Sequence, residues 1–475
     1  MRAERLFSII LLVYLLLGLI NLDTLPVVWN DEIQNLDPAV QHLQTNQWVS
    51  WLWPNPGATE QFASYPPFIH HWHRLMLMVL PLSPFWTRLP FLLVTVASLW
   101  ALFHILKRSG TEAYLAAGLT LLFAWDRSVF ELARSVRIEP LAMALVLGYA
   151  WSPRSLLLRA SCISLLPTCH LLYAPLALSL WLYEWTRHPN KRDTATLIAP
   201  AAIMATYLMY HYNWDLSSAY QQMSYQISKH RQNLDSNGLN ELLYTYKQAP
   251  FQALFFLTAI VYMAARQARL QQHNPWFYAL VLYALTLMAA QPLHRYWPMA
   301  WLLMALALAP HLKQAPKWLL TLAALALING ASLYAARHFS ALADRPSRLS
   351  EPALKWLDEQ LKNAPDGSLI TGSALAAYAG YRNPHIEYGM PDYLQTFQHP
   401  RKPITDVYVL DFGTGHRGPD TLTLPPADCL GSYHTAPAMS IVGFQNWPGE
   451  SYQGMKLYRL KNREDWVKLM PTDTR

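Results

Sequence analysis

Two adjacent carboxylates, Asp31 and Glu32, follow closely after an apolar run that extends from Leu6 to Leu22. If that run crosses a membrane, the pair lies where the helix leaves the bilayer. A charge beside hydrocarbon is costly unless water or a partner stabilises it, so acidic pairs at such a place commonly bind metal, move protons or act as general bases. The alternative interpretation is the solvated start of a loop, and the pair alone does not decide between them.

The composition indicates a polytopic membrane protein. Of the 475 residues, 53% are hydrophobic and only 14% are charged, whereas a soluble domain has about 25% charged residues. The mean hydropathy is nevertheless only +0.08. A sizeable water-exposed portion must therefore accompany the apolar segments.

The cysteines and the net charge argue against other classes. Cys162, Cys169 and Cys429 are odd in number and scattered, so they indicate neither a disulfide framework nor a zinc site. The net charge of +7 comes from short basic clusters between apolar runs, which is typical of topology signals. No nucleic-acid partner is expected.

Windows of about 19 residues predict about eleven membrane-spanning helices. They cover residues 6–25, 86–106, 113–125, 136–151, 155–171, 172–186, 195–212, 249–265, 276–290, 297–311 and 316–335. With this count the basic clusters between the spans fall on one side, which predicts a cytoplasmic N-terminus. Residues 26–85 and the tail from about residue 336 then lie on the other side, the periplasm in a Gram-negative bacterium.

Residues 66–82 form a further apolar segment, but counting it as a span would invert every later loop. Its first half carries His70, His71, His73 and Arg74, which fits a helix lying in the membrane interface better than a crossing. The first outer loop, residues 26–85, is therefore predicted to contain interfacial helices. The three histidines are also candidate metal ligands, with simple interfacial solvation as the alternative.

The tail differs from the rest of the chain in the length and spacing of its apolar runs. Residues 351–361 have helical spacing of apolar residues, and short apolar runs at 368–371, 407–410 and 456–460 follow between Pro and Gly residues. We therefore predict two domains, a membrane module over residues 1–335 and an extracytoplasmic α/β domain over residues 336–475.

Several further polar groups are predicted at the outer ends of the spans, on the same face as the acidic pair. They are Tyr65, beside Pro67 where the first loop closes, Arg134, Arg137 and Glu139 at the outer end of the fourth span, His170 between two short spans, and His294, Arg295 and Tyr296 before the tenth. An Arg at a helix end is by itself more often a snorkelling side chain. The convergence of these groups on one face indicates a site.

Carboxylates, arginines and histidines at a membrane surface suit a substrate that has a phosphate and a lipid tail. Arg binds phosphate oxygens in bidentate fashion, and a carboxylate can deprotonate an acceptor hydroxyl. The apolar spans offer a groove for the tail. The reaction indicated is transfer of the group carried on the lipid phosphate.

At these residues the sequence resembles the membrane-integral glycosyltransferases of the GT-C fold, in the branch with protein O-mannosyltransferases and lipid A aminoarabinose transferases. The resemblance covers residues 6–335 and, more loosely, the tail. It is carried by Asn30-Asp31-Glu32, Tyr65-Pro66-Pro67, Arg88-Leu89-Pro90, Arg134 to Pro140, Arg295-Tyr296-Trp297-Pro298, Trp356-Leu357 and the stretch from Ala376 to Arg382.

The resemblance implies an inverting transferase of a bacterial inner membrane that uses a polyprenyl-phosphate-linked monosaccharide. Asp31 would be the general base that activates the acceptor hydroxyl, and Glu32 would support it or hold a divalent metal cation. Glu139 would act on the acceptor or on a cation. Arg137 and Arg295 would grip the donor phosphate and stabilise the leaving polyprenyl phosphate.

The sequence departs from the family pattern at two places. Many relatives carry a charged residue just before the Pro of the loop motif, where this chain has Ser64-Tyr65, so a metal site there does not carry over. Many also have Lys after the fifth span, where His170 stands here. A histidine donates to phosphate only when protonated or in the right tautomer.

Other functions remain open from the sequence. The acceptor is a protein, lipid A or a polysaccharide, and membrane lipids surround the module. One alternative is a transporter or flippase of lipid-linked sugars, although no repeat relates the two halves and the charges lie at the ends of the spans. The other is an oligosaccharide transferase or polymerase, which usually has longer outer loops.

Overall fold

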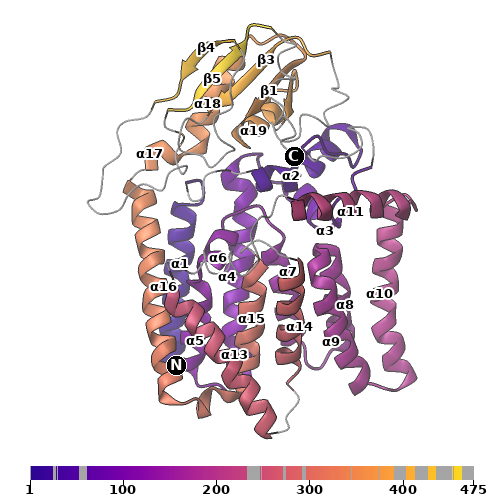
Figure 1. Ribbon diagram of the computed structural model, residues 1–475, viewed down its shortest axis with the longest axis vertical. Helices are drawn as coiled ribbons and strands as arrows, with labels where there is room; N and C mark the ends of the chain where they lie inside the picture. Colours follow the sequence, from indigo (N-terminus) through magenta and orange to yellow (C-terminus); the bar gives the residue numbers. More distant parts are fainter. Residues whose placement is uncertain are drawn as a thin grey trace.

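The structure is a computed structural model that describes residues 2–24, 28, 30–52, 61–232, 247, 249–270, 274–290, 296–343, 345–372, 374–389, 403–411, 426–434, 452 and 454–462. It is mostly helical, with a small sheet at one end (Figure 1).

Each predicted span coincides with a helix. These helices are α1 (Arg2–Ile20), α4 (Pro84–Arg108), α5 (Ala113–Ala124), α7 (Glu139–Trp151), α8 (Leu156–Cys169), α9 (Ala174–Arg187), α10 (Lys191–His211), α13 (Pro250–Leu270), α14 (Pro275–Ala290), α15 (Trp297–Leu308) and α16 (Lys317–Ala343). Among the described residues, α1, α4, α13 and α16 are the four helices long and apolar enough to cross a membrane alone. The polytopic helical fold is thus confirmed, while the number of crossings stays a prediction.

The first outer loop contains two helices, α2 (Asn30–Thr45) and α3 (Phe68–Leu77). They lie at the same end of the bundle as α11 (Leu216–Gln232), above the long helices in Figure 1. The ten residues of α3 extend over about 15 Å, half of the hydrocarbon thickness. Such a helix is too short to cross, which agrees with the interfacial placement of this segment.

Helix α16 continues beyond the predicted end of its span at residue 335 and reaches Ala343. The extra turns are stabilised because Tyr334 and His338 have buried partners on α6 (Arg127–Leu132) and just after it. Packing therefore stabilises the helix beyond the residue at which hydropathy predicts its end.

The C-terminal domain is an α/β unit, as predicted. After the short α17 (Arg345–Arg348), it contains α18 (Ser350–Leu361), β1 (Ser368–Gly372), α19 (Ala374–Arg382), β2 (Ile386–Gly389), β3 (Val407–Asp411), β4 (Ala427–Ser432) and β5 (Lys456–Leu460). The strand order is β2-β1-β3-β5-β4. Strand β1 is parallel to β2 and β3, whereas β5 is antiparallel to β3 and β4.

Tyrosine hydroxyls join this domain to the membrane module. The hydroxyls of Tyr378 and Thr87 are 2.9 Å apart, and the Val28 N–H donates to the hydroxyl of Tyr452 over 3.1 Å. Tyr388 donates to the carboxylate of Asp37 on α2 over 2.6 Å. The domain consequently rests on α2 and α4, beside the loop that carries the acidic pair (Figure 1).

Candidate active site

Asp31, Arg137 and Glu139 form one ion-paired group where α2 and α7 begin. The Nη1 atom of Arg137 is 2.7 Å from Oδ2 of Asp31, and its Nη2 is 2.6 Å from Oε1 of Glu139. The Nε atom of Arg137 lies 3.0 and 3.1 Å from the two Glu139 oxygens. Glu139 also stands in the first turn of α7, where the helix dipole favours a negative charge. One guanidinium thus bridges two carboxylates that the sequence placed in the site.

Burial distinguishes the two carboxylates of this group. The side chain of Asp31 is 28% exposed, whereas those of Glu139 and Arg137 are 2% and 6% exposed. A substrate that approaches from outside therefore meets Asp31 first, with Arg137 and Glu139 behind it.

Glu32 faces a different partner, Arg88 on α4. Two of its contacts form a bidentate pair, with Arg88 Nε to Oε2 at 2.8 Å and Nη2 to Oε1 at 2.6 Å, and both side chains are fully buried. The Val136 N–H donates to the same carboxylate over 3.3 Å. Both Glu32 oxygens are thus engaged, which favours a positioning role over the catalytic or metal-holding role that the resemblance implies.

An aromatic group adjoins Arg137. The ring of Tyr296 is centred 5.9 Å from the guanidinium carbon of Arg137, and its hydroxyl is 3.3 Å from Nε2 of His170. The Tyr65 and His170 rings are 5.3 Å apart. The Leu172 N–H donates to Nδ1 of His170 over 3.1 Å, so a neutral His170 carries its proton on Nε2. This is the tautomer that can donate toward a phosphate.

Other predicted site residues lie elsewhere. Pro67 is buried and precedes the first turn of α3, so it sets the entry of that helix. Arg134 is fully buried and faces α16, with its Nη2 2.8 Å from Nε2 of His338 and its guanidinium 3.9 Å from the Phe130 ring. Arg134 therefore has its partners on α6 and α16 and does not join the Asp31 group, so its expected role in substrate binding stays a prediction. His294 and Arg295 lie outside the described residues.

Sequence reasoning missed Asp37, which is fully buried on the same helix as Asp31. Its carboxylate accepts hydrogen bonds from the Ser50 hydroxyl at 2.5 Å, the Trp51 N–H at 2.6 Å and the Tyr388 hydroxyl at 2.6 Å. Asp37 thereby holds α2, the first loop and the C-terminal domain together. The sequence offers no signal for this role, because Tyr388 lies 351 positions away.

The loop histidines do not converge on one point. His70 and His73 both direct Nδ1 to the Asn35 carbonyl, at 3.2 and 2.9 Å, whereas His71 meets His211 at 3.3 Å. Burial lowers the pKa of His71 and of His73 to about 4. These histidines are consequently neutral at pH 7 and brace α3 against its neighbours.

The described residues show no preformed site for the divalent cation that the resemblance suggested. Among the described residues, no group of three or more His, Cys, Asp or Glu side chains is arranged to hold a metal ion. Glu32 and Glu139, the two carboxylates expected to act on a cation, are paired instead with the guanidinium groups of Arg88 and Arg137.

No family model matches the sequence, and no curated protein matches it either. The structure of ArnT from Cupriavidus metallidurans bound to undecaprenyl phosphate is similar to the chain with a TM-score of 0.57 and 12% identity, over 96% of this chain and 97% of that one. The apo structure of that ArnT gives a TM-score of 0.53 and 10% identity over 99% of both chains. The chain has the GT-C fold. At these identities the likeness establishes the fold alone. A zinc- and sulfate-bound oligosaccharyltransferase from Archaeoglobus fulgidus is similar with a TM-score of 0.48 and 13% identity, over 84% of this chain and 67% of that one. This TM-score is too low to establish a common fold.

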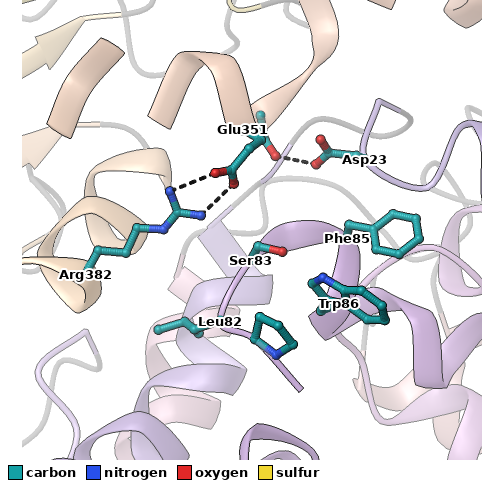
Figure 2. Close-up of a pocket in the computed structure, with 9 residues that line it drawn as sticks. Asp23, Leu82, Ser83, Phe85, Trp86, Glu351 and Arg382 are labelled. Carbon is teal, nitrogen blue, oxygen red and sulfur yellow. Dashed lines mark hydrogen bonds and ion pairs between the residues drawn. The ribbon is translucent and has the colours of Figure 1, made fainter. Parts of the chain in front are cut away.

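The membrane module and the C-terminal domain also meet at a pocket of about 320 Å³. Figure 2 shows Arg382 and Asp23 on either side of Glu351, above an apolar floor with Phe85 and Trp86. Arg382 Nη2 is 2.6 Å from Glu351 Oε2. The Ser350 hydroxyl donates to the Asp23 carboxylate. These polar groups thus have partners from both parts of the chain, and the pocket lies at the junction of the domains.

Proposed function

We propose that the chain is an inverting glycosyltransferase that moves a monosaccharide from a polyprenyl-phosphate carrier to an acceptor hydroxyl. The observation that carries the proposal is the accessible carboxylate of Asp31, held by a buried Arg137–Glu139 pair at one end of a GT-C bundle. The similar ArnT structure binds undecaprenyl phosphate, which supports a donor of this lipid class.

In this proposal Asp31 accepts the proton of the acceptor hydroxyl as the hydroxyl oxygen attacks the anomeric carbon. The bond between that carbon and the phosphate oxygen breaks, and the polyprenyl phosphate leaves with the bonding electrons. A single displacement inverts the anomeric configuration. No covalent enzyme intermediate is required.

The remaining residues bind and orient the substrates. The charge of Arg137 fixes the Asp31 carboxylate and stabilises the departing phosphate, together with Arg295. His170, Tyr296 and Tyr65 supply hydrogen-bond donors beside it. Glu139 keeps Arg137 in place and holds its charge beside the acceptor.

The proposed setting is the inner membrane of a bacterium, with a cytoplasmic N-terminus. In this setting the site of the membrane module, residues 1–335, and the domain of residues 336–475 both face the periplasm. The acceptor is a hydroxyl on a protein, lipid A or a polysaccharide. Mass spectrometry of the lipid-linked sugars can identify the sugar of the donor.

The test is mass spectrometry of polyprenyl-phosphate sugars from host cells that carry the wild-type protein or Asp31→Asn. A monosaccharide carrier that accumulates only with Asp31→Asn would name the donor and establish a transferase. Glu112→Gln is the matched control, since it removes an exposed carboxylate distant from Asp31 in sequence. Identical carrier pools in all three strains would reject the proposal and favour a lipid transporter, and an accumulated oligosaccharide carrier would favour an oligosaccharide transferase.

A further inference from the structure

A second feature lies near the opposite end of the bundle, where α13 ends and α16 begins. The two helices pack against each other and border a groove of about 530 Å³. In Figure 1 this end is near the N-terminus and away from the C-terminal domain. The groove is therefore separate from the Asp31 group.

The wall of the groove is apolar and faces outward. Val261 is 68% exposed, Leu257 is 54% exposed and Trp318 is 56% exposed. In a membrane protein such side chains contact lipid tails, and a Trp at the end of a helix commonly lies at the level of the headgroups. The groove is thus shaped to take an acyl chain.

Two arginines, Arg266 and Arg269, line the groove on α13. Neither has a carboxylate partner among the described residues, and the sequence has no Asp or Glu from Phe251 to Ala343. The Nε atom of Arg266 is buried without a hydrogen-bond partner. A buried donor of this kind is costly when left unpaired, so the site lacks an anionic acceptor.

Further positive charge lies close by in the sequence. Lys313 and Lys317 are exposed just before and at the start of α16. Such clusters also serve as topology signals. A topology signal alone does not require an apolar groove or an unpaired buried Nε atom beside the charges. The combination indicates recognition of a lipid that has a negative headgroup.

We propose that this groove binds an anionic phospholipid. The lipid phosphate contacts Arg266 and Arg269, and an acyl chain lies along Leu257 and Val261 with Trp318 at its side. The two uncompensated arginines select an anionic headgroup over a zwitterionic one. The proposal concerns a lipid that stays bound, and it does not depend on the transferase reaction.

The experiment is native mass spectrometry of the purified full-length protein with phosphatidylglycerol or phosphatidylethanolamine that have identical acyl chains. The wild type should retain phosphatidylglycerol about tenfold better, in line with the attraction of two cationic side chains for an anionic lipid. Arg266→Gln/Arg269→Gln should lose this preference. The control Lys191→Gln/Arg192→Gln, which removes the same charge from exposed positions on α10, should keep it.

A second variant guards against misfolding of the double substitution. Val261→Trp fills the groove at an exposed position and leaves both arginines in place, so it should lower retention of phosphatidylglycerol several-fold. Equal retention of the two lipids by the wild type would overturn the proposal. So would equal losses in the groove variant and the α10 control, or retention of undecaprenyl phosphate in preference to phosphatidylglycerol.

Discussion

Asp31 and Glu32 are neighbours in the chain, yet their carboxylates have different partners. Successive residues of a helix point about 100° apart, so at the start of α2 one side chain reaches Arg137 and the other reaches Arg88. The first is accessible and the second is buried. The two substitutions should therefore separate activity from stability.

For Asp31→Asn we expect sugar transfer to fall by about a hundredfold or more, as for loss of a general base. The amide cannot accept the acceptor proton, but it still reaches Arg137 by a hydrogen bond. The measurement is a transfer assay on purified protein, with thermal unfolding as the check on folding. Near wild-type transfer would show that Asp31 is not the base.

Glu32→Gln should instead lower the unfolding temperature. It leaves the guanidinium of Arg88 buried without its counter-charge, a change that costs about 3–5 kcal/mol. Thermal unfolding in detergent measures the effect, with Glu112→Gln as the control for loss of an exposed carboxylate. Equal unfolding temperatures for the two variants would contradict the buried pair.

At the scale of elements, α2 is braced by α3 through its histidines. His70 and His73 both direct Nδ1 to the carbonyl of Asn35, which lies on α2 between the site carboxylate Asp31 and the anchor Asp37. Burial is the main influence on His73 and lowers its pKa to about 4 from an ordinary value of 6.5. The burial of His73, which outweighs the opposing effect of its hydrogen bond to Asn35, makes the stability of the loop sensitive to acid.

The sign of the pH effect follows from that depressed pKa. In the unfolded chain His73 binds a proton below about pH 6.5, whereas in the folded protein it binds one only near pH 4. Stability that is present at neutral pH is therefore lost as the pH falls. Between pH 7 and pH 5 the loss is about 2 kcal/mol for this side chain. Unfolding temperatures of wild type and His73→Gln over this range test it. An equally steep dependence in the variant would exclude His73 as the source.

The elements themselves were largely predictable from the sequence, because apolar length and spacing are local properties. Each predicted span is a helix, and the short runs at 368–371, 407–410 and 456–460 are strands. The grouping of the candidate site was predictable in part, since contacts link Asp31, Arg137, Glu139, Tyr65, His170 and Tyr296, while their functional roles stay a prediction.

The partners that decide each residue's role were not predictable. Arg134 contacts His338, 204 positions away, so its side chain lies against α16 and not in the Asp31 group. Asp37 has its tyrosine partner still farther along the chain. No local pattern records such pairings, since they arise only when the membrane module and the C-terminal domain pack together.

At the scale of the whole molecule, the C-terminal domain is attached through side chains that converge on α2. The close approach of β2 to α19 depends on Gly380, where a Cβ atom would lie 2.4 Å from the Tyr388 ring. Tyr388 is thus held where its hydroxyl reaches Asp37. The domain and α2, which carries Asp31 of the candidate site, share this anchor.

Tyr381→Phe/Tyr388→Phe should loosen the domain, because both hydroxyls lie within hydrogen-bonding distance of the Asp37 carboxylate. Each hydrogen bond to a charged group contributes about 2 kcal/mol. We expect faster proteolysis between the membrane module and the sheet, and slower transfer through displaced α2. Tyr433→Phe, which alters a tyrosine packed on Trp356, is the control. Unchanged proteolysis and transfer would show that the anchor is dispensable.

Helix α16 runs without interruption through 27 residues, about 40 Å at the usual rise. It begins beside the lipid groove at Trp318, and its far turns carry His338, which contacts Arg134 just before the segment with Arg137 and Glu139. If the proposed transferase is correct, lipids packed against the start of α16 act on the same helix whose far turns contact the segment before Arg137 and Glu139. We therefore expect the rate of transfer to depend on bilayer thickness, which reconstitution in lipids of different acyl length would measure.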